Sequence, residues 1–180
     1  KPASVYLRTD ELLSYFGNQS NSRFLASFLY FRFNPSEIEQ LFSSLGCARF
    51  PRRISFTSKL PEMERMLLRK MSRCSDEEPP IDYLYDGIEQ VLSNITSDTS
   101  KLLWRMLLGS LKEFEYWKKA DFFNGTYWWK YYSPYTTKFP AKFTLLLQES
   151  AWLLNAESNF RKPADIAVGE LSQEYTTNSD

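Results

Sequence analysis

Histidine is missing from this sequence of 180 residues, and cysteine is scarce. The absence of histidine excludes Ser-His-Asp catalysis, Cys-His catalysis and any histidine-ligated metal site within these residues. Cys47 and Cys74 are the two cysteines, which are too few for a structural zinc site and allow at most one disulfide. A chain of this length does not need a disulfide to fold, so we expect a reducing, cytoplasmic setting.

Glycine-rich phosphate-binding loops are also missing. The six glycines are scattered, and they form neither G-x-x-x-x-G-K-S/T nor G-x-G-x-x-G. Carboxylates are present, but none stands in a recognisable setting for acid–base catalysis. We therefore predict that the chain itself is not an enzyme and has no catalytic residues, no cofactor and no metal site. No apolar run approaches the ~18 residues that a transmembrane helix needs, so no membrane partner is expected.

Aromatic residues, in contrast, are abundant. Fourteen Phe, eleven Tyr and five Trp make up 17% of the sequence, and 43% of all residues are hydrophobic. This composition indicates a packed globular protein rather than a disordered one. Lys+Arg and Asp+Glu are equal at 22, so the net charge gives no general attraction to nucleic acid or to a membrane surface.

In residues 1–78, caps and apolar spacing predict helices separated by short extended segments. Thr9 can cap one helix, and Asn34 with a glutamate three residues later is a typical start for another. Gly17 and Gly46 end these two helices, since glycine adopts the left-handed C-terminal conformation without strain. The expected elements are a helix over 10–16, an undecided strand or helix over 24–33, a helix over 35–45, an extended segment over 49–58 and a helix over 61–72. The inner stripe of the helix over 35–45 is expected to be Ile38, Leu41, Phe42 and Leu45.

In residues 79–172, the apolar residues from Ile81 to Ile95 repeat every 3.6 positions and predict one amphipathic helix. A second, more apolar helix begins at Thr99 or Ser100 and is expected to lie centrally. The other expected elements are an aromatic strand over 126–132, a helix over 141–150 and a two-stranded hairpin over 151–166. Helix, strand, helix and hairpin in this order is typical of a winged helix. The predicted fold class is therefore α+β, predominantly helical with short strands, with a winged-helix-like C-terminal half.

An acidic stretch that ends in two prolines, over residues 75–80, is the clearest break in the chain. The stretch fits either a surface loop or a subdomain boundary. Taken as a boundary, it divides the chain into an N-terminal helical and extended subdomain over 1–78 and a helix–strand–helix–hairpin subdomain over 79–172. The polar tail over 173–180 is expected to be frayed.

Two short segments near the ends of the sequence resemble each other. Lys162-Pro163-Ala164-Asp165-Ile166 follows the pattern of Lys1-Pro2-Ala3-Ser4-Val5. This similarity predicts that both segments occupy the same part of a repeating unit, with Val5 and Ile166 both extended. Because the sequence also opens on Lys-Pro, we expect it to be a piece of a longer, repetitive protein.

Cations are concentrated between residues 49 and 73, and an acidic block follows over residues 76–89. One hypothesis is a phosphate-binding face that takes nucleic acid. The residues that would bind nucleic acid are Arg52, Arg53, Arg65, Arg69 and Arg73. The alternative is that the basic and acidic blocks neutralise each other, which we favour because the net charge of the sequence is zero.

The aromatic strand over 127–132 is a second candidate site, because aromatic rings beside a lysine can stack on nucleobases. The same residues also fit an ordinary strand that is packed on both faces, and we favour this interpretation.

Several short motifs together resemble the large proteins grouped with sacsin and the plant protein NO VEIN. In the second half of the sequence these motifs are Leu103-Trp104 in a helix, Tyr131-Tyr132, Trp152-Leu153, Lys162-Pro163-Ala164 and Ile81-Asp82-Tyr83-Leu84-Tyr85-Asp86-Gly87-Ile88. In the first half they are Lys1-Pro2-Ala3-Ser4-Val5-Tyr6-Leu7, Tyr15-Phe16-Gly17, Leu45-Gly46-Cys47 and Pro51-Arg52-Arg53. The chain departs from the family at Leu154, where a proline often follows Trp-Leu.

The resemblance implies a parent protein with an upstream GHKL-type ATPase domain, whose signature residues are absent from this sequence. It implies a non-catalytic interaction or transmission module that binds a protein client or other domains of the same chain. A nucleic-acid-binding module, as in bacterial DNA restriction or defence, is the alternative that we do not favour. A purely structural spacer is a third.

Overall fold

The computed structural model describes residues 5–17, 21–58, 62–63, 66–67, 70, 80–113, 121–128 and 136–175. These residues contain α-helices, short 3-10 turns and two small antiparallel sheets. The α-helices are α1 (Asp10–Phe16), α2 (Ser27–Arg32), α3 (Pro35–Ser44), α5 (Ile88–Ser93), α6 (Ser97–Glu113) and α7 (Lys142–Glu149). The strands are β1 (Arg53–Thr57), β2 (Ile81–Tyr85), β3 (Asn124–Trp128), β4 (Thr136–Pro140), β5 (Leu153–Leu154) and β6 (Phe160–Arg161). Short 3-10 turns are η2 (Asn21–Arg23), η4 (Pro163–Asp165), η5 (Val168–Glu170) and η6 (Gln173–Tyr175). The predicted α+β class, mainly helical with short strands, is confirmed.

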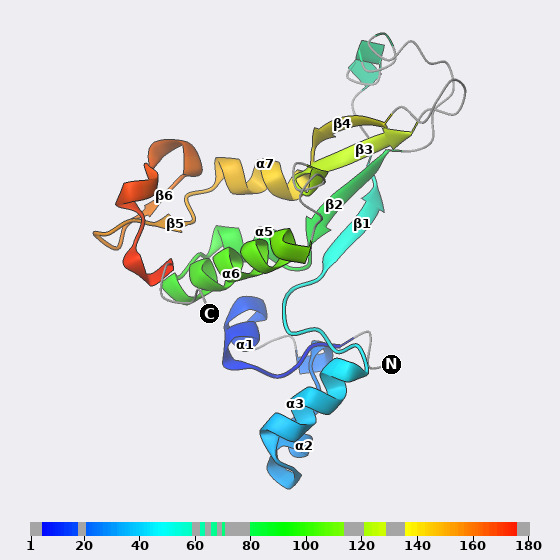
Figure 1. Ribbon diagram of the computed structural model, residues 1–180, viewed down its shortest axis with the longest axis vertical. Helices are drawn as coiled ribbons and strands as arrows, with labels where there is room; N and C mark the ends of the chain where they lie inside the picture. Colours follow the sequence, from blue (N-terminus) through cyan, green and yellow to red (C-terminus); the bar gives the residue numbers. More distant parts are fainter. Residues whose placement is uncertain are drawn as a thin grey trace.

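The larger sheet has the strand order β1-β2-β3-β4, and every neighbouring pair is antiparallel (Figure 1). Helix α7 follows β4 directly, and it is held to the sheet by Asp82. The buried carboxylate of this β2 residue accepts a hydrogen bond from the Lys142 N–H at 2.9 Å, so a strand residue supplies the cap at the start of α7.

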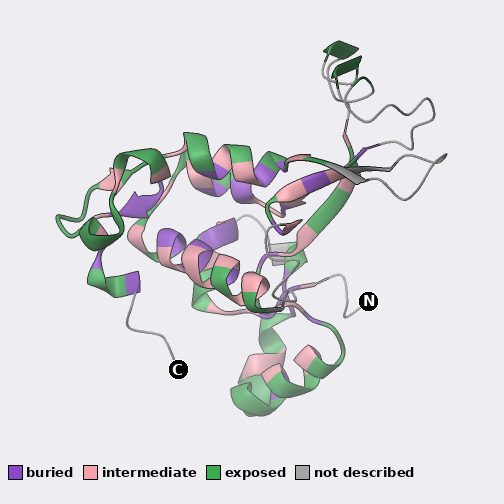
Figure 2. Ribbon diagram, turned by 45° about the horizontal axis from the view of Figure 1, so that its top comes forward, coloured by how far each residue is buried: buried purple, intermediate pink, exposed green. Residues whose placement is uncertain are grey.

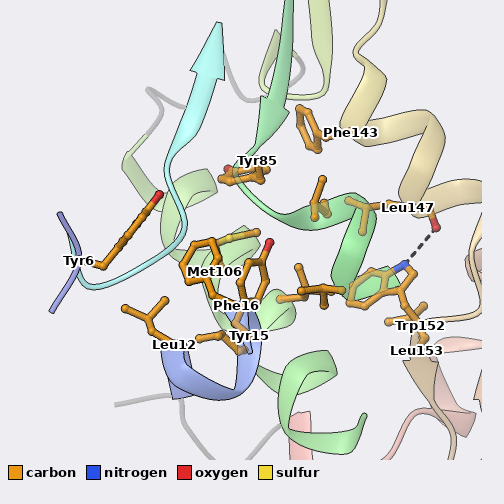
Figure 3. Close-up of a cluster of buried hydrophobic side chains, with 14 of the residues drawn as sticks. Tyr6, Leu12, Tyr15, Phe16, Tyr85, Met106, Phe143, Leu147, Trp152 and Leu153 are labelled. Carbon is orange, nitrogen blue, oxygen red and sulfur yellow. Dashed lines mark hydrogen bonds between the residues drawn. The ribbon is translucent and has the colours of Figure 1, made fainter. Parts of the chain in front are cut away.

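The main hydrophobic core lies between α1, α5, α6, α7 and β5 (Figure 3). Its completely buried side chains include Leu12, Ile88, Leu103 and Phe143. This core and the β1–β2 pairing both join residues on the two sides of position 78. The subdomain division at that position stays a prediction.

Local sequence signals located two helices correctly. Thr9 Oγ1 accepts a hydrogen bond from the Leu12 N–H at 3.3 Å, and α1 ends at Phe16 with Gly17 after it. Asn34 Oδ1 accepts from the Ser36 N–H at 3.0 Å at the start of α3. The undecided segment over 24–33 contains α2. In the segment expected to be helical over 61–72, the described residues 62–63, 66–67 and 70 are helical.

The prediction of one helix from residue 81 to residue 95 was wrong. Ile81–Tyr85 forms β2, and Gly87 has a φ of 79°, which breaks the chain direction before α5. Residues 81, 84, 85 and 88 fit a helical period, but pairing with the distant strand β1 decides the conformation. Helix α6 begins at Ser97, earlier than the predicted start at Thr99 or Ser100. Thr96 caps it, because the Thr99 N–H donates to Thr96 Oγ1 and the Thr96 N–H donates to Thr99 Oγ1.

The hairpin expected over 151–166 is present as β5 and β6. Asn155 Oδ1 accepts hydrogen bonds from the N–H groups of Glu157 and Asn159, at 3.1 and 2.8 Å, and so shapes the turn. Ile166 is extended (φ −135°, ψ 129°) and Val5 lies outside the helices, so the repeat stays a prediction.

The prediction of a frayed tail does not hold for its first three residues. Gln173–Tyr175 forms η6, and the buried Tyr175 hydroxyl accepts a hydrogen bond from the Leu154 N–H at 2.6 Å. The ring also packs on Trp104, with 5.0 Å between ring centroids. Residues 176–180 lie outside the described part of the chain.

Candidate interaction surface

Helices α2 and α3 form a lobe that projects from the main body, at the bottom of Figures 1 and 2. The lobe has a small core of its own, in which Leu7, Leu25 and Cys47 are buried. Partly buried apolar residues complete this core, namely Val5, Leu29, Tyr30 and Phe42. The lobe therefore folds around few apolar contacts, and most of its surface is exposed (Figure 2).

Residue Tyr6 joins the lobe to the main body. Its main chain forms parallel bridges to Phe24 and to Ala48, so three segments lie side by side. Its hydroxyl donates to Asp86 Oδ2 at 2.9 Å, and the same carboxylate receives the Arg23 guanidinium at 2.7 Å. Burial raises the pKa of the Tyr6 hydroxyl, which keeps it a neutral donor.

Five large apolar side chains on this lobe are more than half exposed. Phe31 is 87% exposed, and the others are 51–59% exposed. We call the set the aromatic face, and it comprises Phe28, Phe31, Phe33, Leu41 and Leu45. The three phenylalanines alone expose roughly 400 Å², if each presents about 200 Å² when free. Phe28 and Phe31 lie three residues apart on α2, and Leu41 and Leu45 lie four apart on and just after α3, so each pair shares one side of its helix. Contiguous apolar areas of a few hundred Å² are often interaction surfaces.

The predicted inner stripe of α3 is therefore only partly correct. Ile38 is buried as expected, but Leu41 and Leu45 are more than half exposed. No sequence feature separated these leucines from core residues, since an apolar stripe looks the same whether the chain or a partner covers it.

Arg52 and Arg53, two of the predicted nucleic-acid-binding residues, make contacts within the protein. Arg52 Nη2 donates to the Val5 carbonyl at 2.8 Å and to the Gly46 carbonyl at 3.3 Å, and the guanidinium lies 4.6 Å from the Tyr6 ring centroid. These contacts fasten the lobe to the segment before β1. Arg65, Arg69 and Arg73 lie outside the described residues.

Arg53 packs still more deeply. Its Nη2 donates to the Phe122 carbonyl at 2.7 Å, and its guanidinium lies 3.7 Å from the Tyr83 ring centroid. Burial lowers the pKa of this guanidinium, although it stays charged near neutral pH. Carbonyl oxygens and aromatic rings thus hold Arg52 and Arg53, which leaves neither aimed outward as a phosphate contact.

The described carboxylates of the acidic block have partners other than these two arginines. Asp82 caps α7, Asp86 binds Tyr6 and Arg23, and Glu89 pairs with Lys142 Nζ at 2.6 Å. Residues 76–78 lie outside the described part of the chain. The expectation of mutual neutralisation is therefore wrong for Asp82, Asp86 and Glu89, whose partners come from distant segments.

The aromatic strand begins at Asn124 rather than at Thr126, and β3 ends at Trp128. Its Gly125 is required, because a Cβ there would overlap the Phe139 ring of β4. The side chains of residues 127 and 128 and all of residues 129–135 lie outside the described part of the chain, and the packing of this strand in the core stays a prediction.

An apolar groove between α6 and α7 is a feature that the sequence did not reveal. It encloses about 420 Å³ and is lined mainly by Trp104, Leu107, Leu111, Phe123 and Trp152. A charged cleft of about 350 Å³ is also lined by Trp104, and in it Arg105 pairs with Glu11 at 2.5 Å. Within the described ranges, His, Cys, Asp and Glu residues form no group of three or more that could hold a metal ion.

None of the helices built from described residues has the length and apolar content needed to cross a membrane. Comparison of the chain with protein-family models, with curated proteins and with solved structures finds no match.

Proposed function

We propose that this chain is a non-catalytic protein-interaction module that binds through the aromatic face of the α2–α3 lobe. The observation that carries the proposal is the exposure of Phe31 and its neighbours on a lobe that projects from the main body. Burying the roughly 400 Å² of exposed phenylalanine surface at about 25 cal/mol per Å² would contribute on the order of 10 kcal/mol, before the entropic costs of association. A partner of matching chemistry presents an apolar protein surface, either on a client protein or on another domain of the same parent chain.

The wider setting of the module is also a proposal. The resemblance to sacsin-like and NO VEIN-like proteins would place it downstream of a GHKL-type ATPase domain, in the cytoplasm. Tyr6 would then transmit movement of the lobe to the main core, since it contacts both. A winged-helix arrangement of the second half is compatible with the order α6, β3, α7 and hairpin, although β4 lies between β3 and α7.

Nucleic-acid binding is less well supported than protein binding. Arg52 and Arg53 are used inside the protein, and the net charge is zero. Binding of mixed-sequence duplex DNA at physiological salt would oppose the proposal if its affinity were sub-micromolar and fell steeply with added salt.

A peptide-selection experiment tests the proposal directly. A displayed library of amphipathic helical peptides is selected on the whole chain, and the recovered peptides are titrated against two variants. Phe31→Ser removes the most exposed ring of the aromatic face. Val168→Ser is the matched control, because Val168 is also 87% exposed but lies on η5, far from the lobe in Figure 1.

We expect Phe31→Ser to weaken peptide binding on the order of tenfold or more, as the loss of a central aromatic contact does at other interfaces. Val168→Ser should leave the affinity unchanged. Neither change should alter thermal stability, since both side chains are exposed. Equal affinity of the two variants for the selected peptides would refute the aromatic face as the binding site.

A further inference from the structure

The two edges of the four-stranded sheet differ in how well they resist pairing with another strand. The β4 edge contains Lys138, which forms an ion pair with Asp121, and it ends in Pro140, which has no N–H to donate. The β1 edge consists of Arg-Ile-Ser-Phe-Thr, which has high strand propensity and no proline. No strand among the described residues pairs with the outer side of β1, which forms the margin of the sheet in Figure 1.

The register of β1 shows which main-chain groups point outward. The Asp86 N–H donates to the Arg52 carbonyl at 3.0 Å, so this position bonds toward β2. Bonded positions alternate along an antiparallel strand, which makes Ile54 the next residue bonded to β2. Ser55 and Thr57 therefore direct their N–H and C=O groups away from the sheet, and both residues are exposed.

The sequence of β1 is complementary to itself in the antiparallel sense. If two copies pair about a twofold axis at Ser55, then Ile54 of one copy lies opposite Phe56 of the other, which is a favourable β-branched and aromatic pair. Arg53 lies opposite Thr57, so no like charges face each other. Ile54 is 45% exposed in the single chain and would gain an apolar neighbour.

We propose that β1 pairs with β1 of a second copy of this chain, antiparallel and centred on Ser55, so that one sheet runs through a symmetric dimer. The outward main-chain groups of Ser55 and Thr57 would then find partners in the second copy. Equal numbers of acidic and basic residues leave no net-charge repulsion to oppose this association. This contact is separate from the aromatic face and does not depend on it.

A charge-swap experiment tests the register as well as the dimer. Sedimentation velocity over a range of concentrations gives the dimerisation constant of the unmodified chain, of Ser55→Lys and of Ser55→Glu. Because residue 55 faces its own copy across the axis, each variant places two like charges together. We expect each to weaken self-association on the order of tenfold. An equimolar mixture of the two variants should recover the dimer, since lysine then faces glutamate.

Controls separate this contact from others. Val168→Lys adds the same charge on η5 and should leave the dimer intact. Phe31→Ser should also leave it intact; loss of the dimer in this variant, but not in Ser55→Lys, would assign self-association to the aromatic face and overturn the proposal. An unmodified chain that stays monomeric at every concentration would also overturn the proposal. So would a mixture of Ser55→Lys and Ser55→Glu that fails to form a dimer when each variant alone is impaired. Circular dichroism of each variant confirms that the fold is retained.

Discussion

Removing one hydroxyl from Tyr175 tests whether the C-terminal segment is part of the core. This hydroxyl accepts a hydrogen bond from the Leu154 N–H and lies 2.5 Å from Ser100 Oγ. Ser100 Oγ itself donates to the Trp152 carbonyl at 2.6 Å, so the tyrosine is the donor between the two hydroxyls. All of these groups are buried.

In Tyr175→Phe, the Leu154 N–H loses its acceptor in a buried position, which costs about 1–3 kcal/mol. The lost donor to Ser100 costs about 1 kcal/mol more. We therefore expect the free energy of unfolding to fall by about 2–3 kcal/mol in total, after allowance for the easier burial of phenylalanine.

Tyr15→Phe is a matched control. Its ring is as deeply buried, at 3% exposure, but its hydroxyl has no hydrogen-bond partner among the described residues. Burial raises the pKa of this hydroxyl, as expected for a group that water does not reach. Removing an unsatisfied polar group should leave stability unchanged or raise it by up to about 1 kcal/mol.

Urea unfolding of both variants, with equal m-values, provides the measurement. The reasoning is refuted if Tyr175→Phe changes stability by less than about 0.5 kcal/mol, or if Tyr15→Phe destabilises as much as Tyr175→Phe. A double-mutant cycle with Ser100→Ala then separates the two hydrogen bonds.

Three further predictions concern the backbone, a helix cap and alkaline pH. Gly87→Ala should lower the free energy of unfolding by about 1–3 kcal/mol, because φ is positive and the added Cβ would lie 3.0 Å from an aromatic carbon of Phe16. Gly109→Ala, which adds a Cβ in open space within α6, should raise it by about 0.5–1 kcal/mol. Thermal melts that shift in the same direction for both variants would contradict this. Asp82→Ala should cost about 1–3 kcal/mol in urea unfolding, since the Lys142 N–H loses its buried acceptor, and an unchanged midpoint would show that water replaces the cap. Burial raises the pKa of the Tyr6 hydroxyl above its ordinary value of 10.0, so Tyr6 contributes its full stabilisation below pH 10.0. This stabilisation is lost as the pH rises through the raised pKa, so the free energy of unfolding should fall in that alkaline range. A free energy of unfolding that does not change with pH there would argue against the burial of Tyr6.

Local chemistry determined the parts of the fold that the sequence predicted well. Thr9 and Asn34 cap their helices through atoms only two or three residues away, so no knowledge of the tertiary structure was needed. The hairpin turn at Asn155 is equally local. The error over residues 81–95 arose where a strand partner, 28 residues away in the case of Ser55 and Tyr83, outweighed the apolar period.

The candidate surface was harder to predict than the fold. Exposed and buried apolar stripes follow the same period, so Leu41 was indistinguishable from Ile38 in the sequence. The partners of Arg52 and Arg53 could not be predicted for a similar reason. A cluster of cations suggests carboxylate or phosphate partners, but Arg53 is held by a carbonyl 69 residues away and by aromatic rings that only the tertiary fold assembles.

The anchoring of Tyr6 has a consequence for the order of folding during synthesis. The bridges from Tyr6 to Phe24 and Ala48 can form once the chain up to about residue 50 has left the ribosome, because all of their atoms are then present. The hydroxyl can accept a hydrogen bond from the Arg52 N–H soon afterwards, but its own proton has no acceptor here until Asp86, which also binds Arg23, has been synthesised. Until that residue emerges, the Arg52 contacts are present but the bonds from Asp86 to Tyr6 and Arg23 are not. The hydrogen bond from Tyr6 to Asp86, which joins residues 80 positions apart, is therefore among the last contacts of this segment to form.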